Sequence, residues 1–560
     1  MDLATTPEEI LIDSAKSYYT YLDEHNLGLE ELRILSASLE QERLILTLGT
    51  KLFSQDGLVL GVGETLFELS VYGDMQYNQE HGILEVSPNY ELLESLEQIR
   101  DSKMRKSTNA TYKLVLEKLK LFSDLKFLVR NVGEFVAKHS LKLPSKKPIV
   151  APQIPAYLNE YQKKALDMIF SQSLSYVWGA PGTGKTQVVL FEAVYHYAKQ
   201  GLRTCVLAPT NSALEQIFIT LIEHFKTMDF ELSNLLRLGM PTQKFLNLYP
   251  ECCDPNLLIQ KNQISLFAQP TSLKNRLKNA LIIGFTLDGF IKKSESLEIE
   301  FAHYFLDECA FAPLAKACAL CVDDVPITLF GDHKQLMPIC EMPPKDLRAH
   351  QEVNVWNLSA LFLEEFFTNP QAVLQKQPTD TPLLSHIAEL KYTHRYGDNL
   401  AQILDSTIYH IGLQGRDEAM EVYCIDSGTK REAQNNISQN EAIAIQKLYA
   451  YLHKKSLTQS LGIITPFVNQ KKLLQKTITH SDISTIHSSQ GREWDNVIFS
   501  PVDLHYYLTD SRQISALFGL NVAISRLKKR LFIVCDLGFW QQQEGQFLHA
   551  LLMRSTRINL

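Results

Sequence analysis

The chain has 560 residues, of which 45% are hydrophobic, 9% aromatic and 21% charged, and its formal net charge is −8. This is the composition of a globular protein, and it excludes a disordered, collagen-like or membrane-embedded chain. At roughly 100–200 residues per domain, the length predicts three or four domains. The acidic balance counts against a nucleic-acid partner, because proteins that bind polyanions usually carry at least one basic face.

The N-terminus and the cysteines indicate a cellular compartment. Met1–Thr5 lacks the basic start and apolar core of a signal peptide, and no apolar run reaches the ~20 residues that cross a bilayer. The nine cysteines are too few for a disulfide scaffold, so we expect a cytoplasmic protein, with the nucleus not excluded. Cys318 and Cys321 have the spacing of half a zinc site, but their apolar neighbours favour core packing over a metal.

The first part of the chain alternates between apolar and polar residues. Short alternating runs between Arg33 and Leu84, separated by Gly and Asp, predict a small antiparallel β module. Between Tyr112 and Phe122 the apolar residues recur at three- and four-residue steps, which predicts a helix around Lys103–Phe122. Four prolines between Leu143 and Pro155 indicate a linker, which we prefer to the alternative of a basic localisation signal.

After this linker, strand-like apolar runs alternate with helical segments, which is typical of parallel α/β domains. The stretch from about residue 225 to 280 interrupts the alternation and is expected to be an insertion. A second α/β region runs from about Glu341 to Trp540.

The strongest local motif is a phosphate-binding loop of the form G-x-x-x-x-G-K-T. It comprises Gly179, Ala180, Pro181, Gly182, Thr183, Gly184, Lys185 and Thr186. A strand-like run precedes it and a helix-compatible segment follows, so its N–H groups and the helix N-terminus would face the phosphates. Lys185 would pair with the β- and γ-phosphates of ATP, and the Thr186 hydroxyl would ligate Mg²⁺.

A phosphate-binding loop needs an acidic partner at the end of another strand. The run from Ala302 to Glu308 is apolar and ends in Asp307 and Glu308. Asp307 would hold Mg²⁺ through its shell, and Glu308 would orient and deprotonate the attacking water. An isolated Asp-Glu pair usually caps a helix; its position about 120 residues after the loop favours the catalytic interpretation.

Further motifs follow in a characteristic order. They are Val206–Ala213, Phe330–Pro338, Ile486–Glu493 and Leu520–Lys528. Together with the loop and the acidic pair, they resemble the motif series of superfamily 1 helicases, and within it the UPF-like branch that translocates 5′→3′. The resemblance covers about residues 159–536 and some eight motifs.

The resemblance implies an α/β fold with two RecA-like P-loop motor domains, a small N-terminal β-rich module and a stalk helix. It places the module in residues 1–150, the first motor domain in 151–343 and the second in 344–560.

The resemblance also implies roles for single residues in ATP hydrolysis. Arg526 matches the principal arginine finger and Arg395 the second finger, while Gln335 matches the γ-phosphate sensor. Gln162 matches the glutamine that reads adenine, and Glu493 a residue near the ribose. His394 stands where the family usually has a tyrosine that stacks on the base, which puts purine selectivity in doubt. Cys309 stands where a small residue is usual; we interpret it as a small residue rather than a redox-sensitive thiol.

The partner that the resemblance implies is single-stranded or tailed nucleic acid, DNA or RNA. Its contacts would be Pro209, Thr210, Asn211, Thr286 and Thr485. Small local donors of this kind remove the objection raised by the acidic charge. Lys274, Arg276 and Lys278 are expected to be a solvated charged face, with an extension of the track as the alternative. We therefore expect an ATP-dependent helicase or translocase; the alternative is a strand-stimulated regulatory ATPase, a switch or adaptor without unwinding activity.

Overall fold

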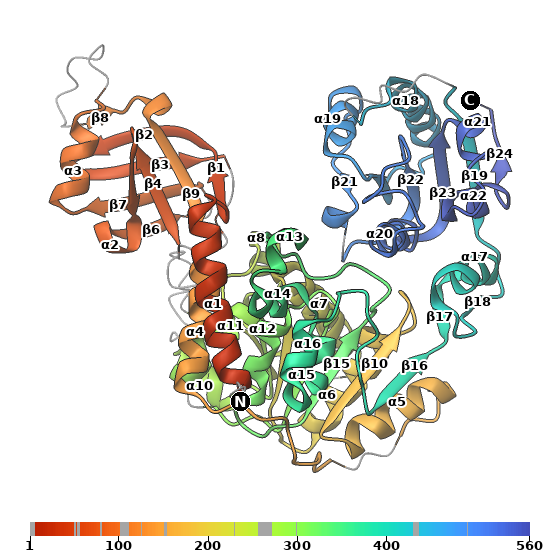
Figure 1. Cartoon of the computed structure of the whole chain (residues 1–560), viewed down its shortest axis with the longest axis horizontal. Helices are drawn as coiled ribbons and strands as arrows, with labels where there is room; N and C mark the ends of the chain where they lie inside the picture. Colours follow the sequence, from red (N-terminus) through yellow and green to blue (C-terminus); the bar gives the residue numbers. More distant parts are fainter. Residues whose placement is uncertain are drawn as a thin grey trace.

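The computed structural model describes residues 6–49, 52, 57–78, 81–100, 111–124, 126–150, 154–228, 230–255, 272–297, 299–428, 436–489 and 491–559. Figure 1 shows three lobes: a small β lobe on a helical stalk, a central α/β lobe and a second α/β lobe near the C-terminus. In none of these described residues does a helix have the length and apolar character needed to cross a membrane.

The N-terminal lobe is antiparallel, as expected from its alternating pattern. Its four-stranded sheet has the order β1–β9–β4–β5, and its five-stranded sheet the order β6–β7–β3–β2–β8. The strands are β1 (Leu29–Leu32), β2 (Ile34–Glu40), β3 (Arg43–Leu48), β4 (Leu58–Val62), β5 (Thr65–Glu68), β6 (Gly73–Asn78), β7 (Ile83–Pro88), β8 (Thr111–Lys113) and β9 (Leu119–Asp124). Short helices α2 (Leu69–Tyr72) and α3 (Tyr90–Glu97) complete the lobe.

The prediction of a helix around Lys103–Phe122 is wrong for the described part of that range, which begins at Thr111. The segment forms β8, one 3₁₀ turn and β9 instead. Leu119 and Leu121 are buried while Lys120 between them is exposed. Buried residues therefore recur every two residues, as in a strand, and not every 3.6 residues, as in a helix. The earlier part of the expected helix, residues 101–110, lies outside the described residues.

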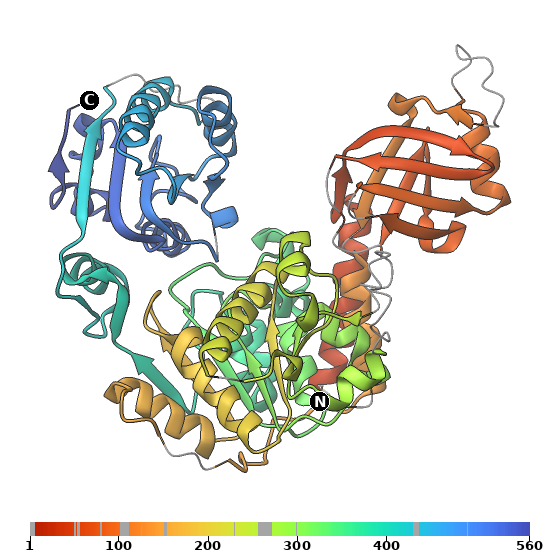
Figure 2. The ribbon, with the colours of Figure 1, turned by 180° about the vertical axis from the view of Figure 1, so that it is seen from behind.

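Two other helices form the stalk. They are α1 (Pro7–Glu24) and α4 (Lys126–Lys138), which pack side by side between the β lobe and the central lobe (Figure 2). Thr6 and Glu9 form a capping box at the start of α1. At its other end, Tyr21 donates from its hydroxyl to Asp346 of the central lobe at 3.0 Å.

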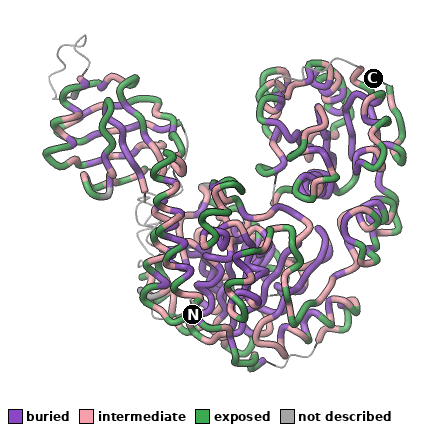
Figure 3. The backbone as a smooth tube through the Cα atoms, viewed as in Figure 1, coloured by how far each residue is buried: buried purple, intermediate pink, exposed green. Residues whose placement is uncertain are grey.

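The central lobe is built on a seven-stranded parallel sheet with the order β12–β13–β11–β14–β15–β10–β16. The strands are β10 (Leu174–Gly179), β11 (Thr204–Ala208), β12 (Leu235–Arg237), β13 (Ile282–Thr286), β14 (His303–Leu306), β15 (Ile327–Gly331) and β16 (Ile387–Leu390). Tyr176 and Trp178 face one hydrophobic cluster and Val177 the other, so both faces are covered, as a parallel sheet requires. Figure 3 shows this burial concentrated along the strands.

Helices cover both faces of this sheet. They include α5 (Glu160–Ser171), α6 (Phe191–Lys199), α7 (Asn211–Thr227), α8 (Gln243–Leu248), α10 (Leu273–Asn279), α11 (Leu287–Leu297) and α12 (Leu314–Ala317). The stretch 225–280, expected to interrupt the alternation, contributes β12 as the edge strand of the sheet, so only its remainder is inserted.

The first sheet extends further along the chain than the expected boundary after residue 343. Helices α13 (Pro344–Leu347), α14 (Asn354–Asn357), α15 (Leu363–Thr368) and α16 (Pro370–Leu374) belong to the segment that follows this boundary. Trp356 and Phe366 on it are buried, and β16, which also lies beyond the boundary, pairs in parallel with β10 of the first sheet. We therefore place the division between β16 and the next strand, β17 (Tyr392–Gly397).

The C-terminal lobe has a six-stranded parallel sheet in the order β21–β20–β22–β23–β19–β24. Its strands are β19 (Glu421–Asp426), β20 (Leu461–Thr465), β21 (Ile483–Thr485), β22 (Trp494–Phe499), β23 (Leu527–Cys535) and β24 (Thr556–Arg557). Its helices include α18 (Gln439–Lys454), α19 (Val468–Thr477), α20 (Ile514–Ile524), α21 (Leu537–Trp540) and α22 (Phe547–Leu552). A small unit of β17, α17 (Asp398–Leu404) and β18 (Gln414–Arg416) lies between the two large sheets.

Candidate functional site

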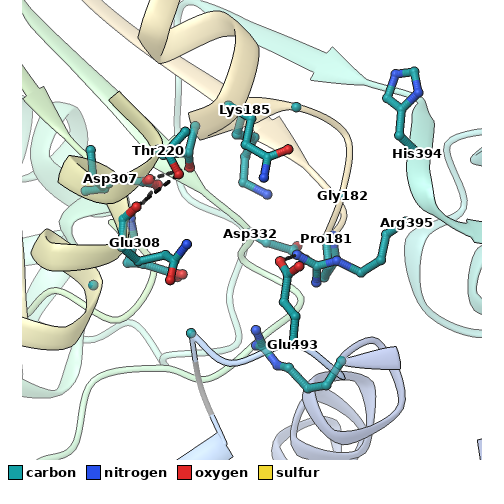
Figure 4. Close-up of a pocket in the computed structure, with 18 of the residues that line it drawn as sticks. Pro181, Gly182, Lys185, Thr220, Asp307, Glu308, Asp332, His394, Arg395 and Glu493 are labelled. Carbon is teal, nitrogen blue, oxygen red and sulfur yellow. Dashed lines mark hydrogen bonds and ion pairs between the residues drawn. The ribbon is translucent and has the colours of Figure 1, made fainter. Parts of the chain in front are cut away.

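A polar pocket of about 290 Å³ lies where the two α/β lobes meet (Figure 4). The predicted residues in its lining are Pro181, Gly182, Gly184, Lys185, Thr186, Asp307, Glu308, Gln335, His394, Arg395, Glu493 and Arg526. They come from segments up to about 350 residues apart, so the fold assembles the site predicted from separate motifs.

The phosphate-binding loop links β10 to the following helical turn. Lys185 donates from Nζ to the carbonyl oxygens of Gly179 (2.6 Å) and Ala180 (3.3 Å), so the ammonium lies over the loop. Gly182 has φ +80°, and a Cβ there would lie 2.3 Å from the Cβ of Arg395. Only glycine allows this turn and this approach of the second lobe.

The acidic pair lies opposite the loop. Thr186 donates from Oγ1 to Asp307 Oδ2 at 2.6 Å, and the Glu308 N–H donates to Asp307 Oδ1 at 2.8 Å. Burial raises the pKa of both carboxyls, and the Asp307 charge raises the pKa of Glu308 further. Glu308 has φ +54°, a left-handed conformation that is uncommon for a non-glycine residue.

These two side chains fit a divalent cation. A hydroxyl and a carboxylate are the hard oxygen donors that Mg²⁺ prefers, and they already lie within hydrogen-bonding distance of each other. A cation there would also offset the charge of the buried Asp307 carboxylate.

The second lobe places Arg526, the predicted principal finger, against Gln335, the predicted sensor. Arg526, just before β23, donates from Nη2 to Gln335 Oε1 at 3.0 Å, and both side chains are buried. Burial lowers the pKa of Arg526 to about 10, so the guanidinium stays charged at neutral pH.

Strand β17 connects the small unit of β17, α17 and β18 to the phosphate-binding loop through hydrogen bonds. Thr393 donates from Oγ1 to the Pro181 carbonyl at 2.8 Å, and the His394 N–H donates to the Gly182 carbonyl at 2.8 Å. Arg395 forms an ion pair with Glu493 and donates to the Ser525 carbonyl at 3.1 Å. The second predicted finger therefore reaches the loop while paired with a carboxylate, as Figure 4 shows.

Gln162 lies behind the phosphate-binding loop rather than in the pocket lining. It completes a capping box with Asn159 at the start of α5, and its amide Nε2 is 3.5 Å from the Thr183 carbonyl. Its contact with adenine stays a prediction. Gly179, Ala180 and Thr183 likewise shape the loop from outside the lining.

Sequence reasoning missed a buried network beside Gln335, the predicted sensor. Asp332 accepts from Gln335 Nε2 (2.9 Å), from the Tyr409 hydroxyl (2.6 Å) and from Trp178 Nε1 (3.1 Å). Asn521 donates to the Tyr409 oxygen at 2.8 Å. Asp332 and Asn521 lie inside motifs already noted, whereas nothing in the local sequence marks Tyr409.

Two missed cations also line the pocket. Arg416 on β18 donates to the Lys528 carbonyl at 2.9 Å, and Lys528 Nζ lies 3.0 Å from Glu493. Lys528 follows Arg526 by two residues and was detectable from its motif; Arg416 reaches the pocket only because β18 pairs with β17.

The predicted nucleic-acid contacts lie at the carboxyl ends of parallel strands. Pro209 and Thr210 follow β11, Thr286 ends β13 and Thr485 ends β21. Thr210 caps α7, and Asn211 begins it. Since β11 and β13 are paired in parallel, their contacts share one edge of the first sheet.

The remaining candidates are the three basic residues of α10 and three cysteines. Arg276 donates to the carbonyl oxygens of Ser233, Leu235 and Glu251, the last two at 2.8 Å, so its guanidinium holds the backbone. Lys274 and Lys278 are exposed. Cys309, Cys318 and Cys321 are buried in the core of the central lobe, where burial raises the pKa of each thiol.

Comparisons with known proteins find similarity in both α/β lobes. Two AAA-domain family models match residues 157–260 and 381–538. The DNA replication ATP-dependent helicase/nuclease DNA2 of Saccharomyces cerevisiae is 24% identical over 67% of this chain and 26% of its own length. The ATP-dependent helicase upf1 of Schizosaccharomyces pombe is 23% identical over 70% of this chain and 46% of its own.

The chain therefore spans less than half the length of these curated relatives. Among solved structures, a complex of the arterivirus nonstructural protein 10 helicase with DNA aligns over 93% of this chain and 79% of that one. The alignment has a TM-score of 0.40 and 13% identity.

Proposed function

Because the chain belongs to the UPF1-like superfamily 1 helicases, we propose that it couples ATP hydrolysis to 5′→3′ movement along single-stranded nucleic acid. One observation carries the proposal: Arg395 and Arg526 from beyond the first sheet line the same pocket as Lys185, Asp307 and Glu308. A pocket completed by two lobes makes hydrolysis depend on how the lobes sit together.

In this proposal the residues of the central lobe bind ATP and Mg²⁺ and activate the attacking water. Lys185 and the loop N–H groups hold the β- and γ-phosphates, and Thr186 and Asp307 hold Mg²⁺. When bound, Mg²⁺ supplies neutralising charge on the phosphates. Glu308 accepts the proton of the attacking water; burial raises the pKa of this carboxyl, which makes its carboxylate a stronger base.

The second lobe supplies positive charge. Arg526 and Arg395 stabilise the charge that develops on the γ-phosphate, a contribution of about 10³–10⁵ in rate for a finger arginine. Arg526 contacts Gln335 directly, so loss of the γ-phosphate can be passed from the sensor to the lobe that moves. His394 and Glu493 would contact the base and ribose.

The strand would cross the carboxyl edges of both sheets. Pro209, Thr210, Asn211 and Thr286 would grip it on the first sheet and Thr485 on the second. We propose three corresponding domains: the β module with its stalk, the lobe of the first sheet through β16, and the lobe that begins at β17.

The test is ATP hydrolysis with and without single-stranded DNA or RNA, followed by strand displacement on duplexes with 5′ or 3′ tails. We expect a strand-stimulated ATPase and displacement from 5′ tails, both lost in Lys185→Ala and Arg526→Ala. Stimulation without displacement from either tail would favour a regulatory ATPase switch, and displacement only from 3′ tails would reverse the polarity. No stimulation by either nucleic acid would overturn the proposal.

A further inference from the structure

Gln162, at the start of α5, is the residue that the family resemblance assigns to adenine. A glutamine reads adenine by accepting from its amino group and donating to a ring nitrogen, so both ends of the amide must face the base. Gln162 is 4% exposed and lies outside the pocket lining. Its Oε1 accepts from the Asn159 N–H at 3.2 Å, and its Nε2 reaches the Thr183 carbonyl at 3.5 Å. Both ends of this amide are therefore turned toward the protein.

Gln162 packs directly against the phosphate-binding loop. Gly184 of the loop has φ +88°, and a Cβ there would lie 2.9 Å from Gln162 Nε2. The Gln162 N–H donates to Asn159 Oδ1 at 2.9 Å, which completes the capping box and holds this end of α5 behind the loop. The side chain thus supports the loop backbone at Thr183 and Gly184.

The base of a bound nucleotide belongs at the end of the pocket that β17 supplies. In the first sheet β16 flanks β10 on one side, whereas β14, which leads to Asp307, lies on the other side beyond β15. Figure 4 shows Asp307 and His394 at opposite ends of the pocket. A nucleotide with its phosphates on Lys185 and its metal at Asp307 therefore has its base toward His394.

His394 is suited to stack on a base. Successive residues of a strand point to opposite faces, so His394 is turned away from Arg395, and its side chain is exposed. The rings of Tyr392 and His394 meet edge to face, with centroids 4.8 Å apart and an interplanar angle of 70°. Burial lowers the pKa of His394 below its usual value, so the imidazole is uncharged at neutral pH. Stacking on such a ring tolerates any base, because every base has a π-face.

We propose that the pocket accepts nucleoside triphosphates without distinguishing adenine from guanine, because the base stacks on His394 and Gln162 is a positioning residue of the phosphate-binding loop. The proposal rests on the proposed function of this pocket in ATP hydrolysis, and it names the substrate class of that site. Groups that hydrogen-bond to one particular substrate can reject a close analogue by about 10⁴–10⁵-fold. Stacking makes no contact with the edge of the base, where adenine and guanine differ.

The first test compares ATP with GTP in the full-length chain at saturating single strand. The two purines offer the same ring system for stacking, so we expect kcat/KM values that differ by less than about tenfold. Displacement of fluorescent N-methylanthraniloyl-ADP by ADP and by GDP should give Kd values that agree within the same factor. A preference for the adenine nucleotide of about tenfold or more in either measurement would overturn the proposal.

The second test separates positioning from base recognition. We expect Gln162→Ala to raise KM for ATP and for GTP by the same factor, because both nucleotides use the same phosphate-binding loop. The matched control is Gln172→Ala at the opposite end of α5, which should leave both KM values unchanged. A loss of kcat/KM that is about threefold or more larger for ATP than for GTP would show that Gln162 reads adenine. Unchanged KM values in Gln162→Ala would overturn its positioning role.

The third test uses the exposed residue. His394→Ala should raise KM for both nucleotides about tenfold, because it removes the stacking ring. His394→Phe is the matched control: it keeps a flat ring without hydrogen-bonding atoms, and we expect it to stay near wild type. Equal losses in the alanine and phenylalanine variants would show that the imidazole nitrogens recognise the base, which would overturn the proposal.

The two levels of the argument fail in different ways. A wild-type chain that hydrolyses neither ATP nor GTP would overturn the proposed function together with this inference. A chain that hydrolyses ATP with strand stimulation and leaves GTP untouched would overturn this inference alone.

Discussion

Arg526 and Gln335 are joined by a hydrogen bond of 3.0 Å, although 191 residues separate them in the chain. Gln335 has two functional ends: its oxygen accepts from the arginine of the second lobe, and its Nε2 donates to Asp332 in the central lobe. The buried amide is therefore a direct mechanical link between the lobes. A γ-phosphate that binds Arg526 or Gln335 in place of this hydrogen bond would therefore change the contact between the two lobes.

Replacing Arg526 with alanine tests the catalytic side of this link. We expect Arg526→Ala to lower kcat of the strand-stimulated ATPase by about 10³-fold or more, because a finger arginine acts in the transition state. Binding of a non-hydrolysable ATP analogue should change little. Arg526→Lys serves as the control that keeps charge without the forked donors, and it should recover only part of the loss. A kcat within tenfold of wild type in the alanine variant would contradict the assignment.

Thr186 gives a test of the metal site with a close control. Thr186→Ala removes the hydroxyl that faces Asp307, whereas Thr186→Ser retains it. We expect the alanine variant to need a tenfold or higher Mg²⁺ concentration for half-maximal ATPase, since Mg²⁺ depends on few protein oxygens. The serine variant should stay near wild type, and chelation should abolish activity in all three. Equal Mg²⁺ requirements would remove Thr186 from the site.

Tyr409 tests the network that sequence reasoning missed. Tyr409→Phe removes one donor to the buried Asp332 and one acceptor from Asn521. Unsatisfied buried polar groups cost about 1–3 kcal/mol, so we expect the free energy of unfolding in urea to fall by that amount. Tyr423→Phe is the control: its hydroxyl meets an exposed Glu421, and its effect should stay within about 0.5 kcal/mol. Similar losses in the two variants would contradict a special role for the network.

The parts of the site that could be predicted are those formed by contiguous residues. Backbone geometry requires glycines and a lysine at fixed spacing in the phosphate-binding loop, so Lys185 and Thr186 were identifiable without a fold. Tyr409 and Arg416 reach the site only because β17 and β18 pair and return the chain to the first lobe, which no local pattern states.

The errors in the fold have similar causes. The apolar residues between Tyr112 and Phe122 predict a helical period, but β9 pairs with β1 and β4 and its residues alternate as in a strand. Likewise β16 joins β10 across more than two hundred residues, so the first sheet runs past the division expected from motif order.

The basic residues of α10 allow the two interpretations of that segment to be separated. Arg276→Ala should lower the free energy of unfolding by about 1–3 kcal/mol, because three carbonyls lose a charged donor. The salt slope of strand binding should not change. Lys274→Ala and Lys278→Ala, at exposed neighbours, should alter stability by less than about 0.5 kcal/mol. A shallower salt slope in all three variants would instead make this helix part of the strand track.

Glu441 provides a pH-dependent prediction in the C-terminal lobe. Its carboxyl group is fully buried, accepts from the Ser500 hydroxyl (2.5 Å) and the Val502 N–H (3.2 Å), and has Asp503 and Asp536 near it. Burial, together with those two negative charges, raises its pKa from 4.5 to about 8. Between these values the folded chain holds a proton that the unfolded chain releases, so stability falls as pH rises, by at most about 1.4 kcal/mol per pH unit.

Glu441→Gln removes this proton-binding group, because the glutamine amide does not titrate. We expect the variant to match wild type near pH 5 and to exceed it in free energy of unfolding near pH 8, as followed by urea titrations across the interval. Glu421→Gln is the control. The exposed Glu421 is paired with Arg530, which holds its pKa below the usual value, so it is ionised throughout this range in both states and its removal should leave the pH dependence unchanged. Parallel pH profiles for wild type and Glu441→Gln would show that the buried carboxyl is already ionised at neutral pH.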